Sequence, residues 1–209
     1  MPKKKRKVGS GNWYNKTITF LPERCDNEVL AAKCLSTLHA FNYKYDTRSI
    51  GISFPGWCED TVGKKLTFIS TSKVELDLLL KHQYFIQMRK LSYFDISATA
   101  QIPDGCEYVS FVRNQSIDKS SAAGQTRKLR RLEKRATARG ESFNPALIKQ
   151  RESIILPHYH SLEIDSQSKK CIFPLNIQMK SEQSFEGDSI FSSYGLSNTD
   201  NSFQPVPLI

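Results

Sequence analysis

The order of apolar and polar positions in the first half of the chain predicts a repeating pattern of strands and helices. Strict alternation is typical of half-buried strands, and apolar residues three or four apart are typical of amphipathic helices. Asp26 is a suitable N-cap for the first helix. The predicted order β-α-β-β-α-β is that of the ferredoxin-like unit. The predicted strands cover residues 13–21, 49–55, 65–71 and 93–102, and the predicted helices cover residues 27–41 and 72–85.

The second half of the chain has a less regular pattern. Ser120 and Ser121 are both suitable N-caps for a helix over residues 121–139, and Gly140 is a suitable residue to follow its end. We therefore expect an α+β fold, with a ferredoxin-like domain in residues 12–105 and a second domain in residues 106–209. Short strands are predicted for this second domain over residues 107–115, 160–164, 171–179 and 189–196.

Composition supports a folded protein that works in a reducing environment. The 209 residues are 39% hydrophobic and 24% charged, which is enough apolar material for one large core or two small ones. No apolar run approaches the roughly 20 residues of a membrane span. The five cysteines form no CxxC pair, so a zinc ribbon or a disulfide framework is not expected.

The positive charge is concentrated in two short segments. Of the formal charge of +9, residues 1–11 supply +5 and residues 127–140 supply +6, so the rest of the chain is slightly acidic. The first segment reads "MPKKKRKVGSG". Residues 2–8 resemble a short basic nuclear import signal, followed by a linker, and we interpret residues 1–11 as an addition outside the fold. A charge focused in one remaining segment favours a nucleic-acid site.

The segment "RKLRRLEKRATARG", residues 127–140, has a one-sided distribution of charge when it is drawn as a helix. Leu129, Leu132 and Ala136 fall on the opposite side and are free to pack. Like charges stacked on one face cost stability unless a polyanion neutralises them, which favours polyanion binding over a merely solvated face. The basic residues that share the face are Arg127, Arg130, Arg131, Lys134 and Arg135.

Several further stretches resemble a known family in the expected order. They read "STLHAFN", "SIGISFP", "RNQSIDKSSAAGQTRKLRRLEKRATARG", "SQSKKCIF" and "SSYGLSN". Together they are similar to the type I-F CRISPR-repeat endoribonuclease, which cuts precursor CRISPR RNA at a repeat hairpin and then caps the guide in the Cascade complex. The stretches "TITFLPE", "VGKK", "ELDLLLK" and "NSFQPVPLI" look like the branch encoded by CRISPR-associated transposons, in which the guide complex recruits the transposition protein TniQ.

The resemblance implies an arginine-rich helix in the major groove of the RNA hairpin. It also implies a linker pair, Arg113 and Gln115, that reads bases low in the stem, and an aromatic residue, Phe173, that stacks on the terminal base pair. An A-form groove admits a helix only near the end of a short stem, which agrees with a compact hairpin as the ligand. The residues expected to bind RNA are Arg113, Gln115, Arg127, Arg130, Arg131, Lys134, Arg135, Arg139, Ser168 and Phe173.

The resemblance assigns catalysis to a helix histidine, matched by His39, to a serine, matched by Ser166 in preference to Ser168, and to a tyrosine, matched by Tyr194. Without the resemblance each would be an ordinary structural or solvated residue. The chemistry suits them, because RNA carries its own nucleophile and an imidazole transfers protons near neutral pH. No cofactor or metal is expected: His158 and His160 lie two residues apart but have no third ligand at suitable spacing.

Two other functions agree with the same residues. A non-catalytic cap subunit would use the RNA-binding residues and not His39, and a DNA-binding regulator would use the basic helix alone. The partners that the resemblance implies are the CRISPR repeat hairpin, the Cascade backbone subunits, TniQ, and target DNA indirectly through the complex, with no membrane. The implied location is the bacterial cytoplasm, with residues 2–8 directing this chain to a nucleus.

Overall fold

The computed structural model describes residues 13–103, 105–120, 122–148, 158–166, 170–181, 190–197 and 204–209. Residues 1–11, interpreted as an added import signal, lie outside this set. Contacts divide the chain into two compact units: Met1–Arg113 together with Tyr159–Ile209, and Asn114–His158. The sequence predicted domains of residues 12–105 and 106–209, and this boundary differs from the division by contacts. The predicted boundary stays a prediction. No helix in the described ranges is both long and apolar enough to cross a membrane.

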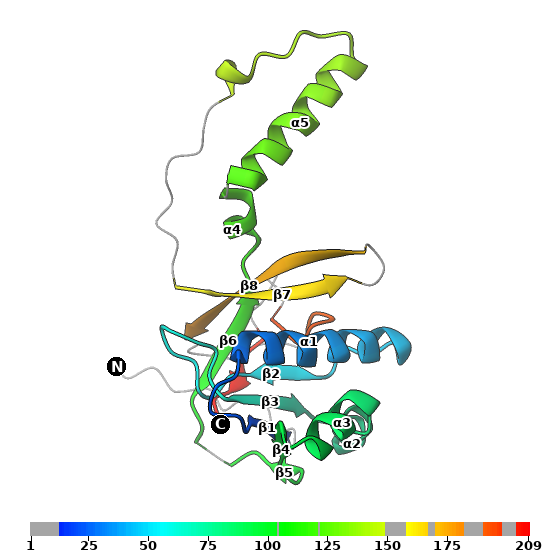
Figure 1. Cartoon of the computed structure of the whole chain (residues 1–209), viewed down its shortest axis with the longest axis vertical. Coiled ribbons are helices and arrows are strands. Elements are labelled where there is room, and N and C mark those ends of the chain that lie inside the picture. The colour runs from blue at the N-terminus through cyan, green and yellow to red at the C-terminus, as the bar shows by residue number, and fades with distance from the viewer. Residues whose placement is uncertain are drawn as a thin grey trace, which may run out of the picture. The chain divides into compact units, whose positions relative to one another are not determined.

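The first unit begins with the predicted ferredoxin-like pattern (Figure 1). Its sheet has the order β2-β3-β1-β4 with antiparallel neighbours, and β5 also pairs with β1. The predicted α+β fold is confirmed. The elements are β1 (Tyr14–Phe20), α1 (Asn27–Lys44), β2 (Gly51–Ser53), β3 (Lys65–Ser70), α2 (Lys73–Leu80), α3 (Gln83–Lys90), β4 (Phe94–Ile96) and β5 (Ala100–Gln101).

Capping residues set where the helices of this unit begin. Asp26 caps α1 as predicted, because its Oδ1 accepts a hydrogen bond of 3.0 Å from the Val29 N–H. The single helix predicted over residues 72–85 is wrong, since the chain forms α2 and α3 instead. His82 has an extended backbone, and its Nδ1 accepts a hydrogen bond of 3.2 Å from the Tyr84 N–H, so it begins a new helix.

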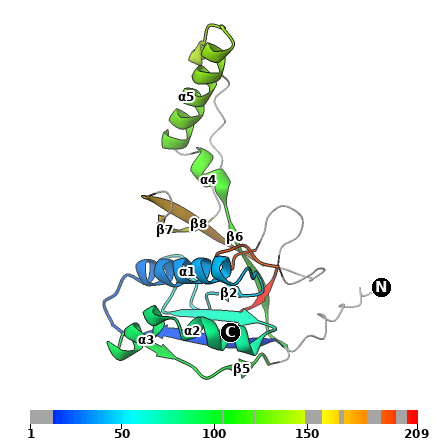
Figure 2. The same ribbon diagram turned by 90° about the vertical axis from the view of Figure 1, so that its right-hand side faces the viewer.

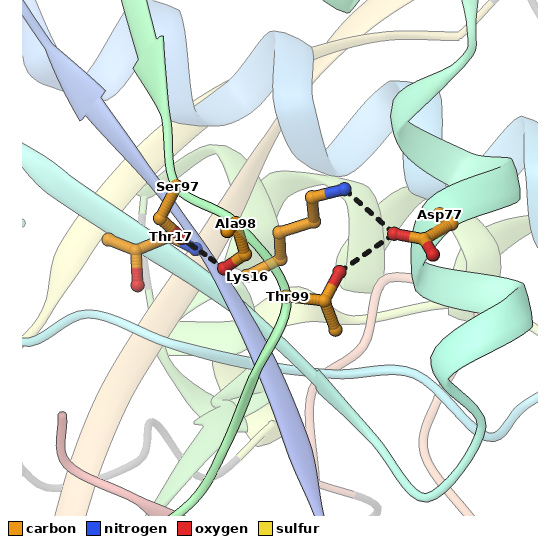
Figure 3. Close-up of polar contacts among 6 residues, drawn as sticks. All are labelled: Lys16, Thr17, Asp77, Ser97, Ala98 and Thr99. Atoms are coloured by element: carbon orange, nitrogen blue, oxygen red, sulfur yellow. Dashed lines mark hydrogen bonds and ion pairs between the residues drawn. The ribbon is translucent and has the colours of Figure 1, made fainter.

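The strand predicted over residues 93–102 is also interrupted. The hydroxyl of Ser97 accepts a hydrogen bond of 2.9 Å from the Thr17 N–H and donates one of 3.1 Å to the Ala98 carbonyl (Figure 3). A side chain thus takes the place of a main-chain acceptor beside β1. The result is two short strands, β4 and β5, in place of one.

An ion pair ties α2 to the sheet (Figure 3). The Lys16 ammonium of β1 lies 2.8 Å from Asp77 Oδ1, and the Thr99 hydroxyl donates a hydrogen bond of 2.7 Å to the same oxygen. The hydrogen bond from Lys16, followed by that from Thr99, lowers the pKa of Asp77. The group therefore joins α2, β1 and the connection between β4 and β5.

A second antiparallel sheet belongs to the same unit, with the order β7-β8-β6-β9. Both views place α1 between the two sheets (Figures 1 and 2). Buried side chains of α1, among them Leu35 and Leu38, join one core with Phe68 of the first sheet and Leu162 of the second. The strands are β6 (Tyr108–Arg113), β7 (His160–Ser166), β8 (Cys171–Ser181) and β9 (Val206–Pro207).

The strand predicted over residues 189–196 is wrong for the part that the structure describes. Residues 191–197 form a turn, in which the Gly195 N–H donates to the Ser192 carbonyl at 2.9 Å. The backbone of Gly195 has a φ of +75°, in the left-handed region that ends an extended strand. Ser197, the last residue of the turn, forms an isolated bridge to Val112 of the second sheet.

The second unit contains the predicted basic helix, which is α5 (Ala122–Ala138), preceded by α4 (Gln115–Ser120) and followed by a 3₁₀ turn, η1 (Pro145–Leu147). Helical structure starts earlier than predicted, because Asn114 Oδ1 accepts a hydrogen bond of 2.9 Å from the Ser116 N–H. Gly140 follows the end of α5 as predicted, with a φ of +71°. Its N–H donates to the Thr137 carbonyl, and the Glu141 N–H donates to that of Ala136, which is a Schellman motif.

Candidate functional site

A cleft of about 820 Å³ runs along α1 on the side that meets β7. Its walls include His39 from α1, Ser166 from the end of β7 and Tyr194 from the turn of residues 191–197. The fold thus brings together three residues that are far apart in sequence and that were expected to act together. Their catalytic role stays a prediction. Ser168, the other candidate serine, lies outside the described residues.

The imidazole of His39 is held between two tyrosine rings. The Tyr194 ring stacks on it with a centroid separation of 4.2 Å and an interplanar angle of 5°. The Tyr43 ring meets it edge-on at 4.7 Å and 65°. Within the described residues, Nδ1 of His39 is buried and has no hydrogen-bond partner. Burial, and then the charge of Arg48, lower the pKa of His39 below its ordinary value.

The turn that carries Tyr194 is fastened to both neighbouring elements. The side-chain amide of Asn42, on α1, donates a hydrogen bond of 2.9 Å to the Ser193 carbonyl. The Ile52 N–H of β2 donates one of 3.0 Å to the Gly195 carbonyl. Burial is the main reason that the pKa of Tyr194 lies above its ordinary value. The phenol therefore stays protonated at neutral pH and can donate a hydrogen bond.

Tyr43, Glu163 and Asp165 also line the cleft, and sequence reasoning did not single them out. Tyr43 follows His39 by one helical turn, so their spacing could have indicated a shared face. Glu163 and Asp165 are two apart on β7 and share one strand face. Alternating polar residues are ordinary on a half-exposed strand, so the sequence carried no signal that these carboxylates would face a cleft.

Arg113 and Phe173, two of the residues expected to bind RNA, lie together; their role in binding stays a prediction. The Arg113 guanidinium lies over the Phe173 ring, 5.6 Å from its centroid. The two side chains come from β6 and β8, and both are half-buried. Nε of Arg113 is buried and lacks a hydrogen-bond partner in the described part of the chain. Gln115, the other member of the expected linker pair, is exposed at the start of α4.

Of the two histidines considered as zinc ligands, His160 has structural contacts within the fold. His160 is buried, and its Nε2 donates a hydrogen bond of 2.8 Å to the Cys58 carbonyl. Its ring also meets the Trp57 ring edge-on at 4.4 Å. His158 is exposed. The described ranges contain no group of three or more histidine, cysteine or acidic residues arranged to hold a metal ion.

The burial pattern of α5 follows the helical wheel drawn from the sequence. Leu129 and Leu132 are half-buried and Ala136 is buried. The single ion pair in the described part of this unit joins Arg139 to Glu141 at 2.8 Å. Arg139, although exposed, is thus partly neutralised by this acidic neighbour. The side chains that form the basic face, all of them exposed, are Arg127, Arg130, Arg131, Lys134 and Arg135.

Most of the chain matches a known protein family. The model of the family described as CRISPR-associated protein (Cas_Csy4) matches residues 16–207. This range begins in β1 and ends in β9, so it contains the cleft, the pair of Arg113 and Phe173, and the basic helix. No curated protein sequence matches the chain.

We predict that Gly195→Ala disrupts the cleft. A Cβ at this position would lie 2.7 Å from Leu38 Cδ2 and 2.9 Å from Ile52 Cγ2, and the φ of +75° disfavours alanine as well. Gly105→Ala is the matched control, because its φ of +84° is similar but no atom lies within 4 Å of a Cβ there. In urea unfolding, the control should lose about 1–2 kcal/mol of stability. Gly195→Ala should lose about 1–3 kcal/mol more, from overpacking, and equal losses in the two variants would contradict the prediction.

Proposed function

The chain belongs to the CRISPR-associated protein (Cas_Csy4) family, whose members are endoribonucleases that process CRISPR repeat RNA, and on this premise we propose that it cuts the repeat hairpin by attack of the RNA's own 2′-OH without a metal ion. The observation that carries the proposal is the meeting of His39, Ser166 and Tyr194 in one cleft. The three residues come from three separate segments of the chain, and residues that were merely solvated would have no reason to line the same cleft.

The proposed reaction is an internal transesterification. The 2′-oxygen forms a bond to the adjacent phosphorus as the bond from phosphorus to the 5′-oxygen breaks. The proton of the 2′-OH leaves to a base, and a proton is delivered to the departing 5′-oxygen. The products are a 2′,3′-cyclic phosphate and a 5′-hydroxyl, with no net uptake of water.

His39 is the proposed proton-transfer group of this reaction. Its lowered pKa keeps the imidazole largely neutral near pH 7, which is the form that accepts a proton. Tyr194, stacked on the ring, would orient the imidazole. Ser166 would hold the ribose next to the scissile phosphate. Either Ser166 or Ser168 is able to provide that hydroxyl, and Ser166 is favoured because it lines the cleft.

The basic face of α5 would hold the RNA stem. Five exposed cations on one side of a helix match a closely spaced row of phosphates, and arginine is able to bind guanine or phosphate through two hydrogen bonds. Arg113 and Gln115 would read bases low in the stem. Phe173 would stack on the terminal base pair, although its ring is half-buried and presents only part of its surface.

A cap within a guide complex is the proposed biological setting. After cleavage the protein would stay on the 3′ hairpin of the guide and join the Cascade backbone subunits, with TniQ as a further partner and target DNA contacted through the complex. Residues 2–8 would send this chain to a nucleus, whereas the natural location would be the bacterial cytoplasm. The alternative function is a cap that binds the hairpin without cutting it.

We predict that binding and cleavage separate at His39. His39→Ala should bind the repeat hairpin nearly as well as the parent, because the cations of α5 dominate affinity. It should cut at least about a hundredfold more slowly in single-turnover assays, since proton transfer by a side chain contributes roughly 10²–10⁴ in rate. A 2′-deoxy group just upstream of the cut should abolish cleavage while leaving binding intact, and EDTA should change neither. If His39→Ala cut at the parental rate, another mechanism would be favoured. If the unmutated protein did not cut the hairpin at all, the non-catalytic cap would be favoured.

We predict that the basic face of α5 accounts for most of the hairpin affinity. A triple Arg130/Arg131/Arg135→Ala variant should bind the hairpin far more weakly, with a loss of about 1–3 kcal/mol for each bidentate base contact. If Lys134 contacts only a phosphate, Lys134→Ala should instead reduce the slope of log affinity against log salt concentration by about one. A Lys81/Arg89/Lys90→Ala variant removes the same charge from exposed residues in the first unit and is the control. Equal weakening by both triple variants would show a non-specific charge effect.

We predict that the protein releases its product slowly. A subunit that caps the guide should perform few turnovers with excess hairpin, and it should copurify with guide RNA, backbone subunits and TniQ when these are expressed together. Gel filtration of the assembled complex, with the RNA content measured in each fraction, is the test. Rapid multiple turnover with free product would contradict the cap function while leaving the cleavage reaction intact.

A further inference from the structure

Arg48, in the segment between α1 and β2, is held in place by several hydrogen bonds. Its Nη1 donates to the carbonyls of Asn42 and Thr47 at 2.9 and 2.6 Å. Its own carbonyl accepts a hydrogen bond of 2.8 Å from the Phe191 N–H, at the start of the turn that carries Tyr194. One residue therefore contacts the end of α1 and the turn, which are the two elements that bring His39 and Tyr194 together.

The residues on either side of Arg48 are fixed as well. The Thr47 hydroxyl donates a hydrogen bond of 3.1 Å to Glu75 Oε1, and the Ser49 hydroxyl donates to Glu75 Oε2. The hydroxyl oxygens of Thr47 and Ser49 lie 3.0 Å apart. Glu75 lies in the first turn of α2, so the segment around Arg48 is fastened to a packed helix. A long, exposed arginine would move freely, but this one has a defined position.

A continuous column of groups leads from Arg48 to His39. The guanidinium lies over the Tyr43 ring, 5.1 Å from its centroid. Tyr43 in turn meets His39 edge-on at 4.7 Å, and His39 stacks on Tyr194. A cation over an aromatic face is attracted to the ring electrons, which helps to hold the guanidinium over Tyr43, the ring that contacts the imidazole.

We propose that Arg48 is a positioning residue for the cleavage reaction: its fixed positive charge, held over Tyr43, keeps the His39 imidazole neutral so that it enters the reaction as a base towards the 2′-OH. The inference rests on the proposed function of His39 in proton transfer. Nothing in it requires Arg48 to touch the RNA.

Two features of the site disfavour the charged imidazolium. Burial and the charge of Arg48 both lower the pKa of His39, burial being the larger cause. Glu163 and Asp165 line the same cleft, and the pKa of His39 is lowered in their presence. The titratable or charged groups around the cleft are Lys33, Tyr43, His82, Tyr84, Glu163, Asp165 and Tyr194.

The proposed consequence is a reaction that stays fast at mildly acidic pH. Neutral imidazole takes the proton of the 2′-OH as the 2′-oxygen attacks phosphorus, and the imidazolium that forms later loses that proton. If the pKa of His39 were higher, more of the protein would begin with a protonated imidazole that cannot act as a base. Arg48 would thus extend the active range downwards in pH.

The test is an NMR titration of the histidine ring protons of the full chain between about pH 5 and 8, the range in which histidine changes charge. The His39 signal is identified by its loss in His39→Ala. Arg48→Gln, which keeps a donor for the two carbonyls but removes the charge, should move the His39 midpoint upwards. Arg48→Lys should leave it close to the parent. Lys44→Gln is the matched control, because Lys44 lies over the ring of Tyr45 and not of Tyr43.

An unchanged His39 midpoint in Arg48→Gln would overturn the inference. Should Arg48→Gln fail to fold, Tyr43→Leu replaces it: the guanidinium loses the ring that holds it, and the same upward shift is expected. Single-turnover cleavage supplies the second measurement, in which the acidic limb of the pH–rate profile should move upwards with the NMR midpoint. Parental cleavage by His39→Ala would refute the proposed function, whereas the NMR shift would still decide whether Arg48 controls the imidazole.

Discussion

Helix α1 packs on two sides at once, and the arrangement of the first unit depends on that constraint. Its buried side chains, including Ala31, Leu35 and Leu38, belong to the core between the sheets. Its other side forms one wall of the cleft against β7. His39 lies at the boundary between these two environments. It is buried enough for its charged form to be disfavoured, and it still lines the cleft where a substrate would bind.

The turn of residues 191–197 depends on α1 in the same way. It is held by Asn42, by the β2 backbone and by the carbonyl of Arg48, in addition to hydrogen bonds within the turn. Gly195 lies so close to Leu38 and Ile52 that no side chain fits there. Close packing of this kind gives Tyr194 a fixed place over the imidazole. A proposed catalytic group is therefore supported by the hydrophobic core itself, which limits how far it moves during a reaction.

Positive charge serves two different purposes in the chain. The basic face of α5 is exposed, so its proposed interaction with RNA would be screened by salt. Arg48 and Arg113 are half-buried, and each lies over an aromatic ring in the first unit. Charges in such places act mainly on their immediate neighbours, including His39 and Tyr194. Under the proposed function, affinity would depend mainly on the exposed cations of α5 and the protonation of His39 on Arg48, in keeping with the proposal that binding and cleavage are separable.

Local patterns in the sequence were enough for the α+β class, the Asp26 cap, the basic face of α5 and the glycine that follows it, because each depends on neighbouring residues and on helical or strand periodicity. The same patterns failed where a side chain replaced a main-chain partner, as at His82 and Ser97. The resemblance to a family named His39, Ser166 and Tyr194, but spacing along the chain could not bring them together. Long-range packing of α1, β7 and the turn did that. The column from Arg48 to His39 likewise exists only in three dimensions, since the effect of a charge on a pKa depends on distance and burial, and neither can be read from residue order.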